Sequence, residues 1–161
     1  MSQPRDNDAD FIDFLIATPR QATATEAAQT QPLGSAPPAA HDAYTRLLHR
    51  LEPDSQRLWA EVQPDVQLRS GVLILDDSVQ DKPYARKMDL VHHQWSGKHH
   101  GVVKGIGLLT LLWTDGDRHL PCDYRIYDKV TDGKTKNDHF QDLLLAAKDR
   151  GFSPEYVLFD G

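Results

Sequence analysis

Three β-type segments after residue 70 constrain the fold of this chain most. The first, "GVLIL" (71–75), is a short continuous apolar run, which is typical of a buried strand. The second, "GVVKGIGLLTLLW" (101–113), is longer and also β-type. The third, "HLPCDYRIYD" (119–128), alternates apolar and polar residues and follows the Asp-Gly turn of "TDGDRH" (114–119). The sequence therefore predicts a three-strand antiparallel meander.

A helix and one more strand complete the pattern. Thr135 and Asp138 resemble a capping box ahead of an amphipathic helix at about 137–150, and Gly151 follows where a C-terminal cap glycine belongs. The apolar "YVLF" (156–159) then predicts a strand in the middle of a sheet. Because a right-handed crossover through the helix lays this strand parallel to an earlier one, we expect an α/β fold.

The residues before this core divide into three stretches. We expect a short helical segment at 1–18, a linker at 19–40 that is rich in small, polar and proline residues, and a small helical region at 41–66. The core is expected at 71–161.

Composition limits the class of protein. The 161 residues carry a net charge of −6, which argues against nucleic-acid binding by the whole chain but leaves room for a local basic face. A single cysteine, Cys122, cannot form an internal disulfide. The N-terminus lacks an apolar core, and the apolar run at 101–113 is interrupted by Lys104 and too short to span a bilayer. We expect a cytoplasmic protein with no membrane partner.

Acidic residues follow two of the predicted strands. Asp76 and Asp77 come directly after 71–75, and Asp160 comes directly after 156–159. Each aspartate by itself also fits a turn at the end of a strand. If the two strands are parallel neighbours, about 4.8 Å apart, carboxylates at their ends could share a divalent cation. Neighbouring strand residues point to opposite faces, so only Asp76 or Asp77 can face such a site, and we favour Asp76.

The motifs in this order resemble a known family. The order of strands and helices resembles the RNase H-like fold. The sequence motifs are similar to those of bacterial insertion-sequence DDE transposases whose first motif is DDS or DDT. The similar stretches are "LILDDSVQDKPYA" (73–85), "VKGIGLLTLLW" (103–113), "LPCDYRIYDK" (120–129), "GKTKNDHF" (133–140) and "RGFSPEYVLFD" (150–160).

The resemblance implies a two-metal site for phosphoryl transfer. Asp76 and Asp160 match the first two of the family's three carboxylates, and Ser78 matches the hydroxyl of the first motif. The implied cofactor is Mg²⁺ or Mn²⁺, and the implied partner is DNA at transposon ends, which the intact family cleaves and joins. The fold implied for this chain is a partial RNase H-like fold, preceded by the small helical N-terminal region.

The third carboxylate of the family, a Glu on a helix well beyond the second Asp, has no counterpart here. The glutamates of the sequence are Glu26, Glu52, Glu61 and Glu155. We therefore expect the N-terminal part of a DDE transposase, truncated after the second Asp, inactive alone and prone to self-association because one face of its sheet lacks covering helices. The alternatives are a residual DNA-binding module and an RNase H-like nuclease, which would need further acids near Asp76 and Asp160.

The middle of the chain is rich in histidine and basic residues. In "HHQWSGKHH" (92–100) the histidines form adjacent pairs without a nearby cysteine, which argues against zinc, and we expect a polar connection there. The basic side chains of residues 71–161 form either a solvated surface or contacts with DNA. The candidate DNA contacts are Lys82, Arg86, Lys98, Lys104 and Lys136.

Overall fold

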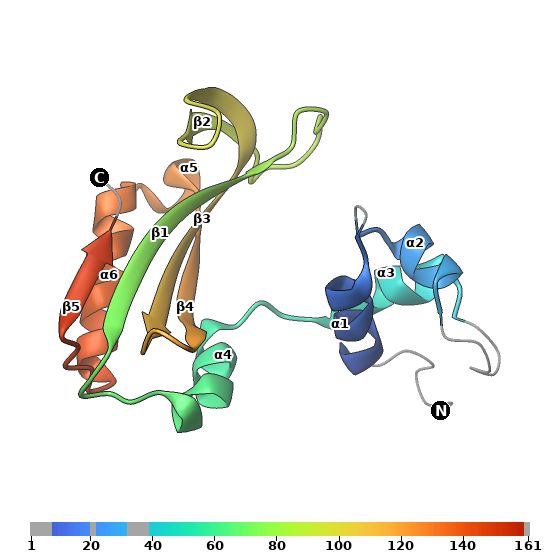
Figure 1. Cartoon of the computed structure of the whole chain (residues 1–161). Coiled ribbons are helices and arrows are strands. Elements are labelled where there is room, and N and C mark those ends of the chain that lie inside the picture. The colour runs from blue at the N-terminus through green and yellow to red at the C-terminus, as the bar shows by residue number, and fades with distance from the viewer. Residues whose placement is uncertain (1–7, 20–21, 32–38, 160–161) are drawn as a thin grey trace. The chain divides into compact units, whose positions relative to one another are not determined.

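The computed structural model describes residues 8–19, 22–31 and 39–159, which form two compact units that divide between Pro53 and Asp54 (Figure 1). The first unit contains helices α1 (Asp8–Ala17), α2 (Ala24–Gln29) and α3 (His41–Arg50). Tyr44 and Leu47 of α3 are buried against Ala27 of α2, and the Phe11 ring lies 5.9 Å from the Tyr44 ring. The segment before residue 54 therefore has a small apolar core of its own.

The helical part of the chain is organised differently from the sequence prediction. Helix α2 lies inside the stretch 19–40, which we predicted to be a linker; the Thr23 hydroxyl caps it by accepting from the Glu26 backbone N–H at 3.1 Å. Helices α3 and α4 (Ser55–Val62), predicted as one region, fall in different units. Short helices acquire most of their stability from packing, which a polar, alanine-rich sequence does not reveal.

A five-stranded mixed sheet forms the second unit. Its elements after α4 are a 3₁₀ turn (Gln63–Asp65), β1 (Val72–Asp81), β2 (His92–Ser96), β3 (Gly101–Thr114), β4 (His119–Tyr127), α5 (Lys129–Asp132), α6 (Lys136–Asp149) and β5 (Tyr156–Phe159). Strand β3 pairs antiparallel with β1, β2 and β4, whereas β5 pairs parallel with β1. The predicted meander of three strands, followed by a helix and a parallel strand beside the first, is confirmed.

Strand β5 was predicted in the middle of the sheet, but among the described strands it pairs only with β1 and lies at the edge. Two other strand predictions were also wrong. Strand β1 does not end at Leu75 but continues to Asp81, because the long β3 supplies backbone partners as far as Gly105. The stretch 92–100 is not a simple connection, since its first half forms β2 and pairs with the start of β3. Asp, Ser and His are poor indicators of a strand, so backbone pairing with β3 decided both cases.

The core of this unit lies on one face of the sheet. Leu73 and Leu75 of β1 lie opposite Trp113 and Leu111 of β3 and share a buried cluster with Leu143 of α6. Trp59 of α4 joins the same cluster. Both α4 and α6 therefore cover the same face. No helix among the residues described here is long and apolar enough to cross a membrane.

A buried charged group lies beside this core. The Asp123 carboxylate has no exposed surface and lies 2.5 Å from Arg125 Nη1 and 3.0 Å from Arg150 Nη2. The Arg150 guanidinium also donates to the Cys122 carbonyl at 3.0 Å and lies over the Trp59 ring at 5.1 Å. Two cations around one buried carboxylate tie the end of α6 to β4 and α4.

Cys122 is expected to resist thiol reagents in the folded protein. Burial raises the pKa of its thiol to about 11, so the thiol stays protonated at pH 8, and the thiolate is the reactive form. Labelling with a chromogenic disulfide reagent at pH 8 should be negligible in buffer and complete in concentrated urea. Rapid labelling of the native protein would contradict the burial of this side chain.

Strand β5 is expected to promote self-association. All four of its residues are exposed, with Phe159 at 68% and Leu158 at 54%, and among the described strands only β1 pairs with it. An exposed apolar strand edge favours pairing with another chain. Sedimentation velocity should show an average mass that rises with concentration, and Leu158→Lys should reduce this rise. A mass independent of concentration in the unmodified protein would contradict the prediction.

Candidate functional site

The two adjacent acids of β1 point to opposite faces of the sheet. Asp77 continues the row of Leu73 and Leu75 on the face that carries α6, whereas Asp76 lies on the other face. The Ser78 hydroxyl, two residues further on the same face as Asp76, donates to Asp76 Oδ2 at 2.5 Å. The Asp76 carboxylate is otherwise exposed, so its second oxygen is accessible to a cation.

Asp77 is engaged in an ion pair. Its Oδ2 lies 2.5 Å from Nζ of Lys136, the first residue of α6. The same ammonium lies 5.5 Å from the centre of the Tyr127 ring on β4. Lys136 is positioned by the capping box of α6, in which Thr135 and Asp138 satisfy each other's backbone N–H groups. The predicted DNA contact Lys136 thus neutralises an acid of β1 in this structure.

Strand β5 lies beside β1 in a parallel register. The parallel register pairs Leu73 with Val157 and Leu75 with Phe159. In the sequence the next residues of the two strands are Asp76 and Asp160. Asp160 lies outside the described residues.

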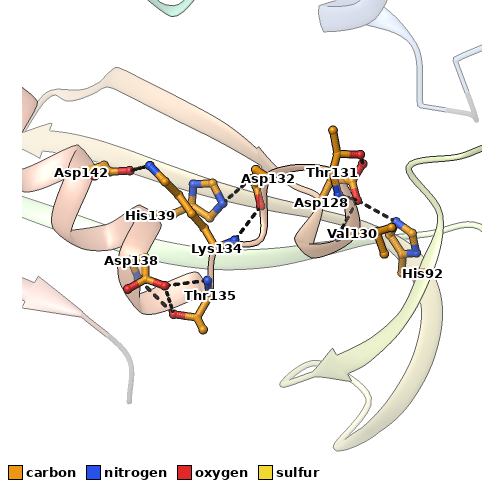
Figure 2. Close-up of polar contacts among 10 residues, drawn as sticks. All are labelled: His92, Asp128, Val130, Thr131, Asp132, Lys134, Thr135, Asp138, His139 and Asp142. Carbon is orange, nitrogen blue, oxygen red and sulfur yellow. Dashed lines mark hydrogen bonds and ion pairs between the residues drawn. The ribbon is translucent and has the colours of Figure 1, made fainter.

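A cluster of polar contacts surrounds the start of α6, and sequence reasoning missed it (Figure 2). His92 Nε2 of β2 lies 3.2 Å from Asp128 Oδ1, and the buried His139 Nε2 lies 2.8 Å from Asp132 Oδ2. These pairs fix α5 between β2 and α6. The His92 and Asp128 positions are 36 residues apart, so no local pattern could have indicated the pair.

Two carboxylates of this cluster are held in the charged form. The Thr131 hydroxyl, which donates to Asp128 Oδ2 at 2.6 Å, is the main cause of the lowered pKa of Asp128. The Lys134 ammonium, 2.6 Å from Asp142 Oδ2, lowers the pKa of Asp142 in the same way. The Asp128 contacts hold the start of α5, whereas the Lys134–Asp142 pair is an exposed surface contact of α6.

The other candidate DNA contacts lie in the segment between β1 and the middle of β3. Arg86 and Lys98 are exposed, and Lys82 is half-buried. The half-buried Lys104 ammonium donates to the Ala85 carbonyl. Four of the five predicted cations thus belong to one stretch of the sequence, 82–104, whereas Lys136 pairs with Asp77.

Within the described ranges, no group of three or more His, Cys, Asp or Glu side chains could hold a metal ion. At the candidate site, the exposed Asp76 carboxylate beside the Ser78 hydroxyl would be available to a divalent cation. These are oxygen donors of the kind that Mg²⁺ prefers. The donor type fits the implied metal, and further ligands would have to come from outside the described part of the chain or from water.

The comparisons with known proteins do not identify a relative. No protein-family model, no curated protein and no solved structure matches this chain.

Proposed function

We propose that the chain carries the first part of a DDE-type phosphoryl-transfer site, with Asp76 and Asp160 as its first two carboxylates and DNA as its substrate. The observation that carries the proposal is the parallel pairing of β1 and β5, in which Leu75 lies beside Phe159. This register supports a shared site because each of these two residues is followed in the sequence by an aspartate.

The topology supports the same proposal. The sequence similarity suggested a partial RNase H-like fold, in which a helix connects an antiparallel meander to a strand parallel to the first. The order β4-β3-β1-β5, with α6 between β4 and β5, agrees with that expectation. When bound, divalent ions would stabilise the charge that develops during phosphoryl transfer.

The contacts of the two adjacent acids favour Asp76 over Asp77 as the first ligand. Asp77 is neutralised by Lys136 at 2.5 Å, whereas Asp76 contacts the neutral Ser78 hydroxyl. A carboxylate that keeps an exposed oxygen and no cationic partner can bind Mg²⁺ without first breaking an ion pair. Asp160 would supply the second carboxylate.

The chain is expected to bind DNA without cutting it. The sequence contains no glutamate after Glu155, and one of the two metal ions would lack a ligand. The alternative of an RNase H-like nuclease needs another acid near Asp76. Asp81 is the next acid along β1 after Asp77. It lies on the face of Asp77, and its carboxylate is already partnered by His99 Nε2 at 2.7 Å.

A metal titration tests the proposal. Calorimetry with Mn²⁺ should show weak binding that falls at least tenfold in Asp76→Asn and in Asp160→Asn. Asp77→Asn is the matched control, since it removes the neighbouring charge on the opposite face, and it should bind like the unmodified protein. Equal binding by Asp76→Asn and the unmodified protein would overturn the assignment.

Activity is tested separately with end-labelled DNA. No strand cleavage is expected in Mg²⁺ or Mn²⁺, with or without inverted repeats. Metal-dependent nicking that disappears in Asp76→Ala would show that another acid completes the site, and the nuclease alternative would then replace the expectation of binding alone.

A further inference from the structure

One segment of this acidic protein has a local excess of basic side chains. Residues 82–104, which we call the basic arm, contain five Lys or Arg and one Asp, together with four histidines. The whole chain carries a net charge of −6. A local excess of positive charge on an acidic protein indicates a surface that attracts a polyanion.

The basic arm contains β2 and the start of β3, and in Figure 1 these lie beyond α5, toward the N-terminal end of α6. Trp95 of β2 pairs across the strands with Val102 of β3, and His93 pairs with Lys104. These four side chains share one face of the two strands, because His93 and Trp95 are two residues apart.

This face is exposed although it carries large apolar groups. Trp95 has 60% of its surface exposed and Val102 has 66%. An indole in a half-covered sheet normally packs against a neighbouring layer, whereas more than half of this one is open to solvent. Tyr84, in the loop of the basic arm that follows β1, is even more exposed, at 91%.

We propose that Trp95 stacks on an unpaired base of DNA while the cations of the basic arm hold the flanking phosphates. Aromatic side chains beside a positively charged strand or groove form the usual platform for single-stranded nucleic acid. In a base-paired duplex the faces of the bases are stacked on each other, so an exposed indole favours single-stranded or distorted DNA. The choice of DNA rests on the proposed function, whereas the stacking site rests on charge and exposure alone.

The other tryptophans make the proposal directly measurable. Trp59 is 8% exposed and Trp113 is fully buried, so an external quencher reaches mainly Trp95. Titration with a single-stranded dT oligonucleotide, in EDTA and at low salt, should quench the intrinsic fluorescence. A duplex of the same length should quench less. Iodide accessibility of the indole should fall when the oligonucleotide is bound.

Affinity is measured with a labelled oligonucleotide by fluorescence anisotropy. Trp95→Ala should weaken single-strand binding roughly tenfold, the order expected for one base stacked on an aromatic ring. Trp95→Phe should restore most of the affinity. Tyr156→Ala is the matched control, because it removes another exposed aromatic ring outside the basic arm and should change nothing.

The outcomes separate the two proposals because EDTA removes any metal. Unchanged affinity in Trp95→Ala, or equal affinity for single strand and duplex, would overturn the stacking site and leave the metal titration unaffected. Binding that depends on Trp95 in a protein that fails the Mn²⁺ titration would uphold the stacking site and remove the proposed function. If dextran sulfate competes as well as DNA and Trp95→Ala has no effect, the basic arm is a polyanion surface without base contacts.

Discussion

Replacing Asp123 by alanine is expected to lower the free energy of unfolding of the unit from residue 54 onwards by about 3–5 kcal/mol. The substitution leaves the Arg125 and Arg150 guanidinium groups without their common counter-ion, and Arg150 itself is largely buried. Burying an uncompensated charge costs far more than losing a surface ion pair. Urea denaturation followed by circular dichroism measures the change.

Two further variants make this result interpretable. Asp123→Asn keeps the size of the side chain and should still destabilise the protein strongly, since the amide retains hydrogen bonds but no charge. Asp142→Ala removes an exposed partner of Lys134 and is expected to have little effect. A stability loss as small in Asp123→Ala as in Asp142→Ala would show that the buried group contributes no more than a surface pair.

Trp113→Ala is expected to destabilise the same unit by about 3–5 kcal/mol through the cavity that it leaves. The indole is fully buried in the cluster formed by β1, β3 and α6, and its Nε1–H donates to the Ser70 carbonyl at 2.9 Å. Gly71 lies so close that an added Cβ would be 2.7 Å from this nitrogen. The surroundings therefore have little freedom to close around a smaller side chain.

Trp113→Phe separates the hydrogen bond from the volume of the ring. It should cost less than the alanine variant, because most of the apolar contact remains and one neutral hydrogen bond contributes about 1 kcal/mol. Trp95→Ala is the control, since its exposed indole should leave the unfolding midpoint unchanged. Equal losses at positions 113 and 95 would contradict the assignment of core and surface.

Local patterns in the sequence predicted much of the sheet. The apolar run at 71–75, the Asp-Gly turn after residue 113 and the capping box at Thr135 each depend on neighbouring residues. A strand, a turn and a helix formed at these places, although β1 extends beyond the apolar run. The crossover rule also predicted that β5 lies parallel to an earlier strand, and the structure shows that this strand is β1.

Elements stabilised by distant partners could not be predicted in this way. Strand β1 extends through Asp76 and Asp77 only because β3 continues beside it, and β2 exists only as a partner of the start of β3. Helix α2 was missed because its stability comes from packing against α3. In these segments backbone hydrogen bonds and tertiary contacts outweigh the weak preferences of Asp, His and Gln.

For the candidate site, the sequence by itself determined which residues carry the chemistry: the acids that follow two apolar strands and the cations between positions 82 and 104. Only the tertiary structure decided their environments. It paired Asp77 with Lys136, which is 59 residues away, and left Asp76 with Ser78 on the opposite face. It also turned Trp95 outward beside Lys104 and His93. Charge and exposure depend on groups that approach through folding, and such proximity is not encoded in any short stretch of the chain.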